Sequence, residues 1–170
     1  INDAGLAHVS GMTGLRNLSL GPPFTRRTPA QVTNAGLLRL KGLTNLEDLN
    51  LGHTQITDAG MVHLKGLSNL QSLWLDGSQV TDAGLAHLAG MNLKKLTIPE
   101  QARTDIGLKH YLAAVKPTTL LLSGWKITDV GLAHLKGLAS LGALWLDGTQ
   151  VTAAGLVALQ HALPGCEIVN

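Results

Sequence analysis

The sequence predicts an α/β solenoid, one domain over residues 1–170, built of about seven coils that each hold a strand and a helix. Three observations support this prediction. A block close to Thr-Asp-Ala-Gly-Leu recurs seven times, at intervals of 31, 24, 24, 23, 24 and 24 residues. Leucine dominates the apolar residues, whereas aromatic residues make up only 3%. The hydrophobic fraction of 45% is ample for a core and excludes a disordered chain.

Each coil is predicted to begin with a strand, as residues 46–51 illustrate. Leu49, Asn50 and Leu51 alternate apolar and polar, which is typical of a strand with one buried face. Equivalent strands are predicted at 70–75, 93–98 and 141–146. In the turn that follows, the hydroxyl of Thr54 is expected to bond backbone groups, and Ile56 is expected to return to the core.

The second half of each coil is predicted to be helical, as in residues 57–67. The apolar residues of this stretch are spaced by three, which places them on one helix face. Thr57 or Asp58 can cap the N-terminus, because their oxygens accept bonds from the first backbone N–H groups. Gly66 lies where the helix is expected to end.

The pattern Leu46-x-x-Leu49-x-Leu51-x-x-Thr54-x-Ile56 resembles the leucine-rich-repeat consensus, with Thr where the commoner form has Asn or Cys. The continuation Thr-Asp-Ala-Gly-Leu-x-His-Leu is similar to bacterial repeats that are frequent in planctomycetes and related to the cysteine-containing repeats of F-box proteins. The resemblance covers nearly the whole chain. It implies a right-handed solenoid, a horseshoe arc with a parallel concave sheet and convex helices, and it implies protein recognition in general.

The two ends of the chain differ in their fit to the repeat. Residues 162–168 resemble the usual end of such bacterial arrays, whereas Ile1 opens in the middle of a repeat. We therefore expect the chain to be the C-terminal part of a longer protein.

Two stretches depart from the repeat. An insertion of seven residues at 21–29, with three prolines and two adjacent arginines, predicts a stiff basic loop. Such a loop is either a tolerated insertion or a partner contact. At 97–103 the turn pattern is lost and Arg103 replaces an apolar residue, so we expect a looser corner. The helix after it, 105–115, reads longer, and Trp125 is expected to fill the altered turn as core.

Outward-facing strand residues are predicted to form two columns on the concave face. The first column holds Asn17, Asp48, Ser72, Lys95, Thr119, Ala143 and Glu167, and the second holds Ser19, Asn50, Trp74, Thr97, Leu121, Trp145 and Val169. Two of the three tryptophans lie in the second column, each within Trp-Leu-Asp-Gly. They are three coils apart, which corresponds to roughly 14 Å at ~4.8 Å per strand.

Tryptophan with polar neighbours has the composition of a protein-binding hot spot. The predicted partner-binding residues are Trp74, Trp145, Asp48, Asn50, His53, Asp76, Lys95, Leu121 and Asp147. Alternatively, both indole rings lie flat on neighbouring strands and shield the sheet. Leu121 beside Trp145 favours an apolar patch that a partner, a symmetry mate or a missing domain covers.

Catalytic and metal-binding patterns are missing from the sequence. It holds no His-Glu-x-x-His, no Gly-x-Ser-x-Gly and no phosphate-binding loop, and Asp76 and Asp147 are expected to lie too far apart for a carboxylate pair. One helix position is shared by His8, His63, His87, His110 and His134, but no ligand recurs beside them. We therefore predict no enzyme, no metal site and no cofactor.

Other classes are excluded by charge and composition. The formal net charge of +2 is too small to indicate nucleic-acid or membrane binding. No apolar run reaches the length of a membrane span, and Cys166, the single cysteine, excludes an internal disulfide. The compartment stays open in the sequence, with the cytoplasm slightly favoured, because a chain that opens in the middle of a repeat can lack a targeting signal for other reasons.

The sequence thus predicts a non-catalytic scaffold that binds a protein partner on its concave face, with little entropy lost because the surface is preorganised. Two alternatives remain open. One is an architectural segment that supports a neighbouring domain or self-associates through its open N-terminal end. The other is glycan binding through the concave tryptophans.

Overall fold

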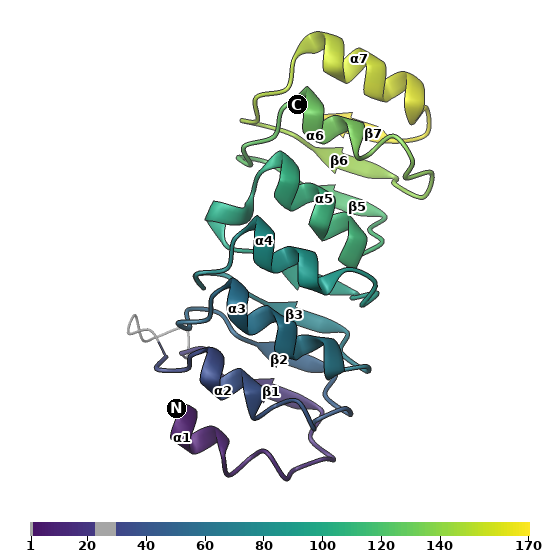
Figure 1. Ribbon diagram of the computed structural model, residues 1–170. Coiled ribbons are helices and arrows are strands. Elements are labelled where there is room, and N and C mark those ends of the chain that lie inside the picture. The colour runs from purple at the N-terminus through teal and green to yellow at the C-terminus, as the bar shows by residue number, and fades with distance from the viewer. Residues whose placement is uncertain (1, 23–29) are drawn as a thin grey trace.

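The computed structural model describes residues 2–22 and 30–170, in which strands and helices alternate along the chain (Figure 1). The strands are β1 (Asn17–Ser19), β2 (Asp48–Asn50), β3 (Ser72–Trp74), β4 (Lys95–Thr97), β5 (Thr119–Leu121), β6 (Ala143–Trp145) and β7 (Glu167–Val169). The α-helices are α1 (Asp3–Leu6), α2 (Asn34–Leu38), α3 (Asp58–Met61), α4 (Asp82–Leu85), α5 (Asp105–Ala114), α6 (Asp129–Ala133) and α7 (Ala153–Ala162). Three 3₁₀ helices join them, namely η1 (Val62–Gly66), η2 (Ala86–Leu88) and η3 (Glu100–Ala102).

The predicted elements exist, with shorter bounds. Each strand pairs over three residues, at the centre of the six predicted. The helix predicted at 57–67 divides into α3 and η1, which ends at Gly66 as expected. The helix predicted at 105–115 is confirmed as α5, which runs over ten residues.

The coils stack in a column with the helices in one layer and the strands in another (Figure 1). The buried apolar residues form a cluster that is mostly leucine, and members of the central strand position, such as Leu49, Leu73 and Leu144, have no exposed surface. Outward-pointing strand side chains form a surface that we call the sheet face. Because the repeated leucine interlocks with its copies in adjacent coils, the core is continuous along the column.

The strands form two parallel sheets, β1-β2-β3-β4 and β5-β6-β7, and not the single concave sheet expected from the sequence. Between β4 and β5, the N–H of Leu93 donates to the carbonyl of Ala114 at the end of α5, at 2.8 Å. Pro117, two residues before β5, has no N–H to donate. Before β4 the backbone turns through left-handed conformations at Gly90 (φ 80°) and Asn92 (φ 52°). We number the coils by their helices, so that coil 4 holds α4 and the following β4. Coil 4 is one residue shorter than its neighbours, and β4 does not pair with β5.

The recurring Thr-Asp-Ala-Gly block joins each coil to the next. In coil 3 the carboxylate of Asp58 accepts bonds from both the N–H and the hydroxyl of Thr81, each at 2.7 Å. Equivalent joints connect Asp3 to Thr33, Asn34 to Thr57, Asp82 to Thr104, Asp105 to Thr128, and Asp129 to Thr152. Gly84 is required because a Cβ there would overlap the Asp58 carboxylate. The joint at the sheet break is incomplete, since Oδ1 of Asp82 is buried without a partner.

The threonines of the block also cap their own helices, although not at Thr57. Thr33, Thr81, Thr104, Thr128 and Thr152 each accept a bond from an N–H in the first turn. The Thr57 hydroxyl makes no such bond, because it accepts one from the side-chain amide of Asn34 at 2.8 Å. The expected backbone bond of Thr54 is present, to the carbonyl of Leu51 at 2.7 Å.

The irregular corner at 97–103, which the sequence predicts to be looser, is held by side-chain hydrogen bonds. The side-chain amide of Gln101 donates to the carbonyls of Ser78 and Val80, both at 2.9 Å. The guanidinium of Arg103 folds back to the carbonyl of Ile98 at 3.4 Å. One coil later Trp125 is 9% exposed, as its predicted core role requires. Of the predicted basic loop at 21–29, residues 23–29, including Arg26 and Arg27, lie outside the described residues.

Candidate functional site

Strand register builds the two predicted columns on the sheet face. In the first sheet Asn50 pairs with Trp74 and Trp74 pairs with Thr97. In the second sheet Leu121 pairs with Trp145 and Trp145 pairs with Val169. The column order predicted from the repeat is therefore correct within each sheet. The estimate of roughly 14 Å between the indoles assumed ~4.8 Å per hydrogen-bonded strand, and the break between β4 and β5 removes that assumption.

The two tryptophans are half-buried, but their neighbours differ in chemistry. Trp74 lies between Asn50 and Thr97, so polar side chains flank its indole. Trp145 lies between Leu121, which is 67% exposed, and the half-buried Val169. Only Trp145 therefore belongs to a continuous apolar surface.

The aspartates that follow the two tryptophans also differ. Asp76 accepts a bond from the Thr97 hydroxyl, and a guanidinium nitrogen of Arg103 lies 3.8 Å from its Oδ1. Asp147 is exposed and accepts one bond, from the Ser123 hydroxyl at 3.2 Å. The carboxylate of Asp76 is therefore occupied within the chain, whereas Asp147 keeps most of its hydrogen-bonding capacity for another molecule.

Most of the polar candidates in the first sheet serve the fold. Asp48 accepts a bond from the side-chain amide of Asn17, and Asn50 accepts one from the N–H of Gly52 at 2.8 Å. His53 is exposed and has a φ of 53°, at the turn position where Gly77 and its later copies have positive φ. Its ring lies where a Cβ on Gly77 would stand. His53 therefore packs along the turn and does not project over the sheet face.

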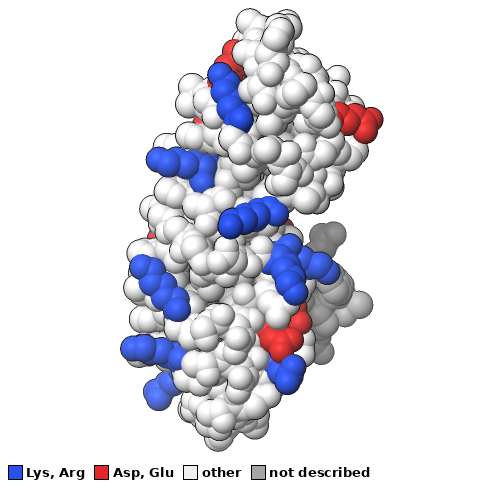
Figure 2. All heavy atoms as spheres, turned by 90° about the vertical axis from the view of Figure 1, so that its right-hand side faces the viewer, with Lys and Arg blue, Asp and Glu red and all other residues white. Residues whose placement is uncertain are grey.

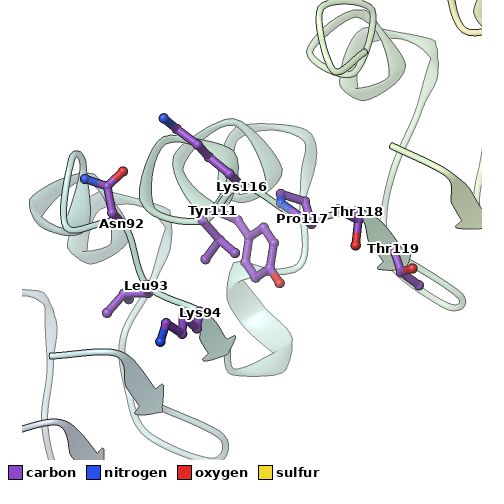
Figure 3. A pocket seen from close by; sticks show the side chains of 9 residues that line it. Asn92, Leu93, Lys94, Tyr111, Lys116, Pro117, Thr118 and Thr119 are labelled. Atoms are coloured by element: carbon purple, nitrogen blue, oxygen red, sulfur yellow. The ribbon is translucent and has the colours of Figure 1, made fainter. Parts of the chain in front are cut away.

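A cleft that sequence reasoning missed opens where the two sheets separate. Its volume is about 420 Å³, and its walls come from Asn92, Leu93 and Lys94 on coil 4 and from Tyr111 and residues 115–119 on coil 5. Figure 3 shows the Tyr111 ring standing between the coil-4 residues and Pro117–Thr119. The ring is fixed by an edge-to-face contact with Trp125, with centroids 6.1 Å apart. Burial raises the pKa of Tyr111 above 10.0, so its hydroxyl remains a donor at neutral pH.

Two sequence signals pointed to this cleft. Coil 4 is one residue shorter than its neighbours, with a spacing of 23 instead of 24, and Pro117 stands just before a strand. Both were visible in the sequence, but neither states how far the strands separate. Lys95 of the predicted set lies at the start of β4, beside this break and exposed.

The described residues were searched for metal ligands, membrane-spanning helices and reactive thiols. Over residues 2–22 and 30–170, no three His, Cys, Asp or Glu side chains gather as metal ligands, and no helix is long and apolar enough to cross a bilayer. Burial and the nearby Glu167 raise the pKa of the Cys166 thiol, which disfavours the nucleophilic thiolate.

Comparisons with known proteins agree with this architecture. A family model described as Leucine Rich repeats (2 copies) matches residues 44–89. The crystal structure of an internalin (inlF) from Listeria monocytogenes str. 4b F2365 superposes with a TM-score of 0.57 at 18% sequence identity. That match covers 96% of this chain and 50% of the internalin chain, so this chain spans half the length of that relative. No curated protein matches the sequence significantly.

The fold is therefore an α/β leucine-rich-repeat solenoid. Proteins of this architecture generally act as scaffolds for protein interaction.

Proposed function

We propose that the chain binds a protein partner on its sheet face, with Trp145 as the principal apolar anchor and Trp74 as a second contact. The observation that carries the proposal is the apolar surface of Leu121, Trp145 and Val169. Exposing a leucine beside a half-buried indole to water is unfavourable, and covering this apolar surface with another molecule lowers the free energy. Tryptophan is also among the residue types enriched at the energetic centres of interfaces.

Rigidity supports the same proposal. β6 is hydrogen-bonded on both sides, to β5 and β7, and Leu144, the preceding residue on the same strand, has no exposed surface. The backbone of Trp145 is therefore fixed before a partner arrives. Little conformational entropy remains to be lost on association, so more of the interface energy appears as affinity.

Photo-crosslinking tests the location of the surface. A photoreactive residue is placed at Leu121 or Trp145, and in matched variants at Val130 or Val157, which are exposed apolar positions on the helix layer. After irradiation in an extract of the source cells, we expect one protein to be captured from the sheet-face positions alone. Binding of the purified candidate is then measured by calorimetry.

Three outcomes contradict the proposal. Capture only from the helix layer places the interface on the other side of the molecule. A crosslinked dimer of the chain supports the self-associating, architectural role. Binding on a glycan array that is lost in Trp145→Ala, with no protein captured, supports sugar recognition through the indoles.

A further inference from the structure

The cleft between coils 4 and 5 lies on the edge of the solenoid where helices connect to strands. These connections carry the basic residues Arg16, Arg39, Lys41, Lys94, Lys116 and Lys136, whereas their acidic residue is Glu47. Glu47 is itself paired with Arg16 at 2.8 Å. Figure 2, which faces this side of the molecule, shows more Lys and Arg than Asp and Glu on the surface. The edge is therefore cationic, although the net charge of the chain is only +2.

Within this edge the cleft combines free charge with a shaped wall. The ion pairs among the described residues are Arg16–Glu47 and Arg103–Asp76, so Lys94 and Lys116 are unpaired. Lys94 lines the cleft from coil 4 and Lys116 from coil 5, and the Lys116 side chain extends away from the Tyr111 ring, toward the rim (Figure 3). The Tyr111 ring stands next to both lysines, and the exposed Thr118 and Thr119, which supply hydroxyl donors, line the cleft on the other side of that ring (Figure 3).

We propose that this cleft binds an acidic peptide segment, with the peptide carboxylates paired with Lys94 and Lys116 and its apolar atoms against the Tyr111 ring. Two lysines on opposite walls attract carboxylates, and the threonine and tyrosine hydroxyls can donate hydrogen bonds to them. The volume of about 420 Å³ accommodates one or two side chains.

A peptide fits the position better than a nucleic acid does. Thr119 lines the cleft and also belongs to β5, between the strands that carry Trp74 and Trp145. A protein lying across the sheet face from one indole to the other would pass this opening. This proposal rests on the proposed function in one respect, namely that the acidic peptide belongs to the protein partner bound on the sheet face. Binding in the cleft does not itself require the indoles, because neither Trp74 nor Trp145 lines the cleft.

The test uses the full chain and a capped hexaglutamate peptide as the probe, followed by amide chemical shifts at constant ionic strength. We expect shift changes centred on Leu93, Lys94 and Thr119. The double variant Lys94→Gln/Lys116→Gln should weaken binding about fivefold to tenfold. The matched variant Arg39→Gln/Lys41→Gln removes the same charge from the same edge and should change binding less than about twofold.

Equal weakening in both double variants, or shifts spread along the whole edge, would show diffuse electrostatics and overturn the proposal. Stronger binding of inorganic phosphate or a short single-stranded RNA, with the same dependence on Lys94 and Lys116, would assign the cleft to phosphate instead. If hexaglutamate causes no change in amide chemical shifts, the peptide-binding proposal is wrong. Trp145→Ala should leave peptide binding unchanged, so failure of the sheet-face proposal is distinguished from failure of this one.

Discussion

The segments Trp74–Gly77 and Trp145–Gly148 have the same four residues and the same strand-and-turn structure, yet they present different surfaces. The first indole lies between Asn50 and Thr97, and the second lies between Leu121 and Val169. The difference arises from the adjacent coils and not from the segments themselves. In a solenoid, the chemistry of a surface residue is therefore set by residues about 24 positions away on either side.

The same contrast extends to the two sheets that hold these segments. β1–β4 form one hydrogen-bonded unit and β5–β7 another, and the joint between them, from Asp82 to Thr104, leaves one carboxylate oxygen unpaired. The four predictions below test how independent the two halves are, in order of decreasing expected effect.

Leu144→Ala removes a fully buried side chain from the second sheet, and we expect a loss of about 3 kcal/mol in the free energy of unfolding. Because the ladder is broken before β5, the damage should be local. Amide hydrogen exchange should accelerate in coils 5–7, while the amides of β2 and β3 keep most of their protection. The matched Leu73→Ala should give the reverse pattern. Equal loss in both halves would show that the break does not divide the solenoid.

Gly131→Ala places a methyl group against the Asp105 carboxylate, which accepts two bonds from Thr128. We expect a loss of about 2 kcal/mol, measured by urea unfolding, because the joint between coils 5 and 6 must open. Gly137→Ala is the control, since no atom lies within 4 Å of the added methyl group. A loss as large in the control would mean that backbone freedom, and not the joint, determines the effect.

Trp145→Ala should weaken binding of the protein partner about tenfold, which is ~1.4 kcal/mol, because it removes the centre of an apolar surface. Trp74→Ala should weaken it less, about threefold, since polar neighbours surround that indole. Calorimetry with the purified partner measures both. A similar loss in affinity for the two variants would show that the environment of the indole does not matter.

Asp129→Asn should have the smallest effect at neutral pH. Bonds from the hydroxyl and N–H of Thr152 hold the pKa of Asp129 below 3.8, so the folded state favours the carboxylate. That stabilisation is present above the unfolded pKa and is lost as the pH falls through the lowered folded value. The difference in unfolding free energy between wild type and variant should therefore shrink between about pH 6 and pH 2. A difference that grows toward acid pH contradicts this assignment.

Asn34 already occupies, in its own coil, the position that Asp129→Asn would change to asparagine. Its amide makes both bonds of the joint, accepting from the N–H of Thr57 at 3.0 Å and donating to the hydroxyl at 2.8 Å. The joint between coils 2 and 3 therefore contains no titrating group, and it serves as an internal control for the acid dependence.

The sequence was sufficient for the regular part of the fold. The repeat of about 24 residues places Leu49, Leu73 and Leu144 in equivalent buried positions, and it places Trp74 and Trp145 in the same outward column. These results follow from periodicity, because each copy repeats the geometry of the last.

The irregular part was beyond this reasoning. A missing residue before β4 and Pro117 before β5 indicate that the coils differ, but the separation of two strands depends on how α5 packs against coil 4. Tyr111 and Lys116 therefore could not be recognised as parts of one cleft. The positive charge of the edge could not be predicted for a different reason. The net charge sums all residues and does not show on which side of the molecule they lie.

The Asp–Thr joints have a consequence for how such a protein can change its length. Each joint runs in one direction, from the aspartate or asparagine of one coil to the threonine of the next. The glycine three residues after that threonine leaves room for the incoming side chain. A duplicated unit of 24 residues would carry both the threonine that bonds to the preceding coil and the aspartate that bonds to the following coil. It could enter the array between two regular coils without any compensating substitution, whereas the same insertion beside β4 would meet a mismatched neighbour.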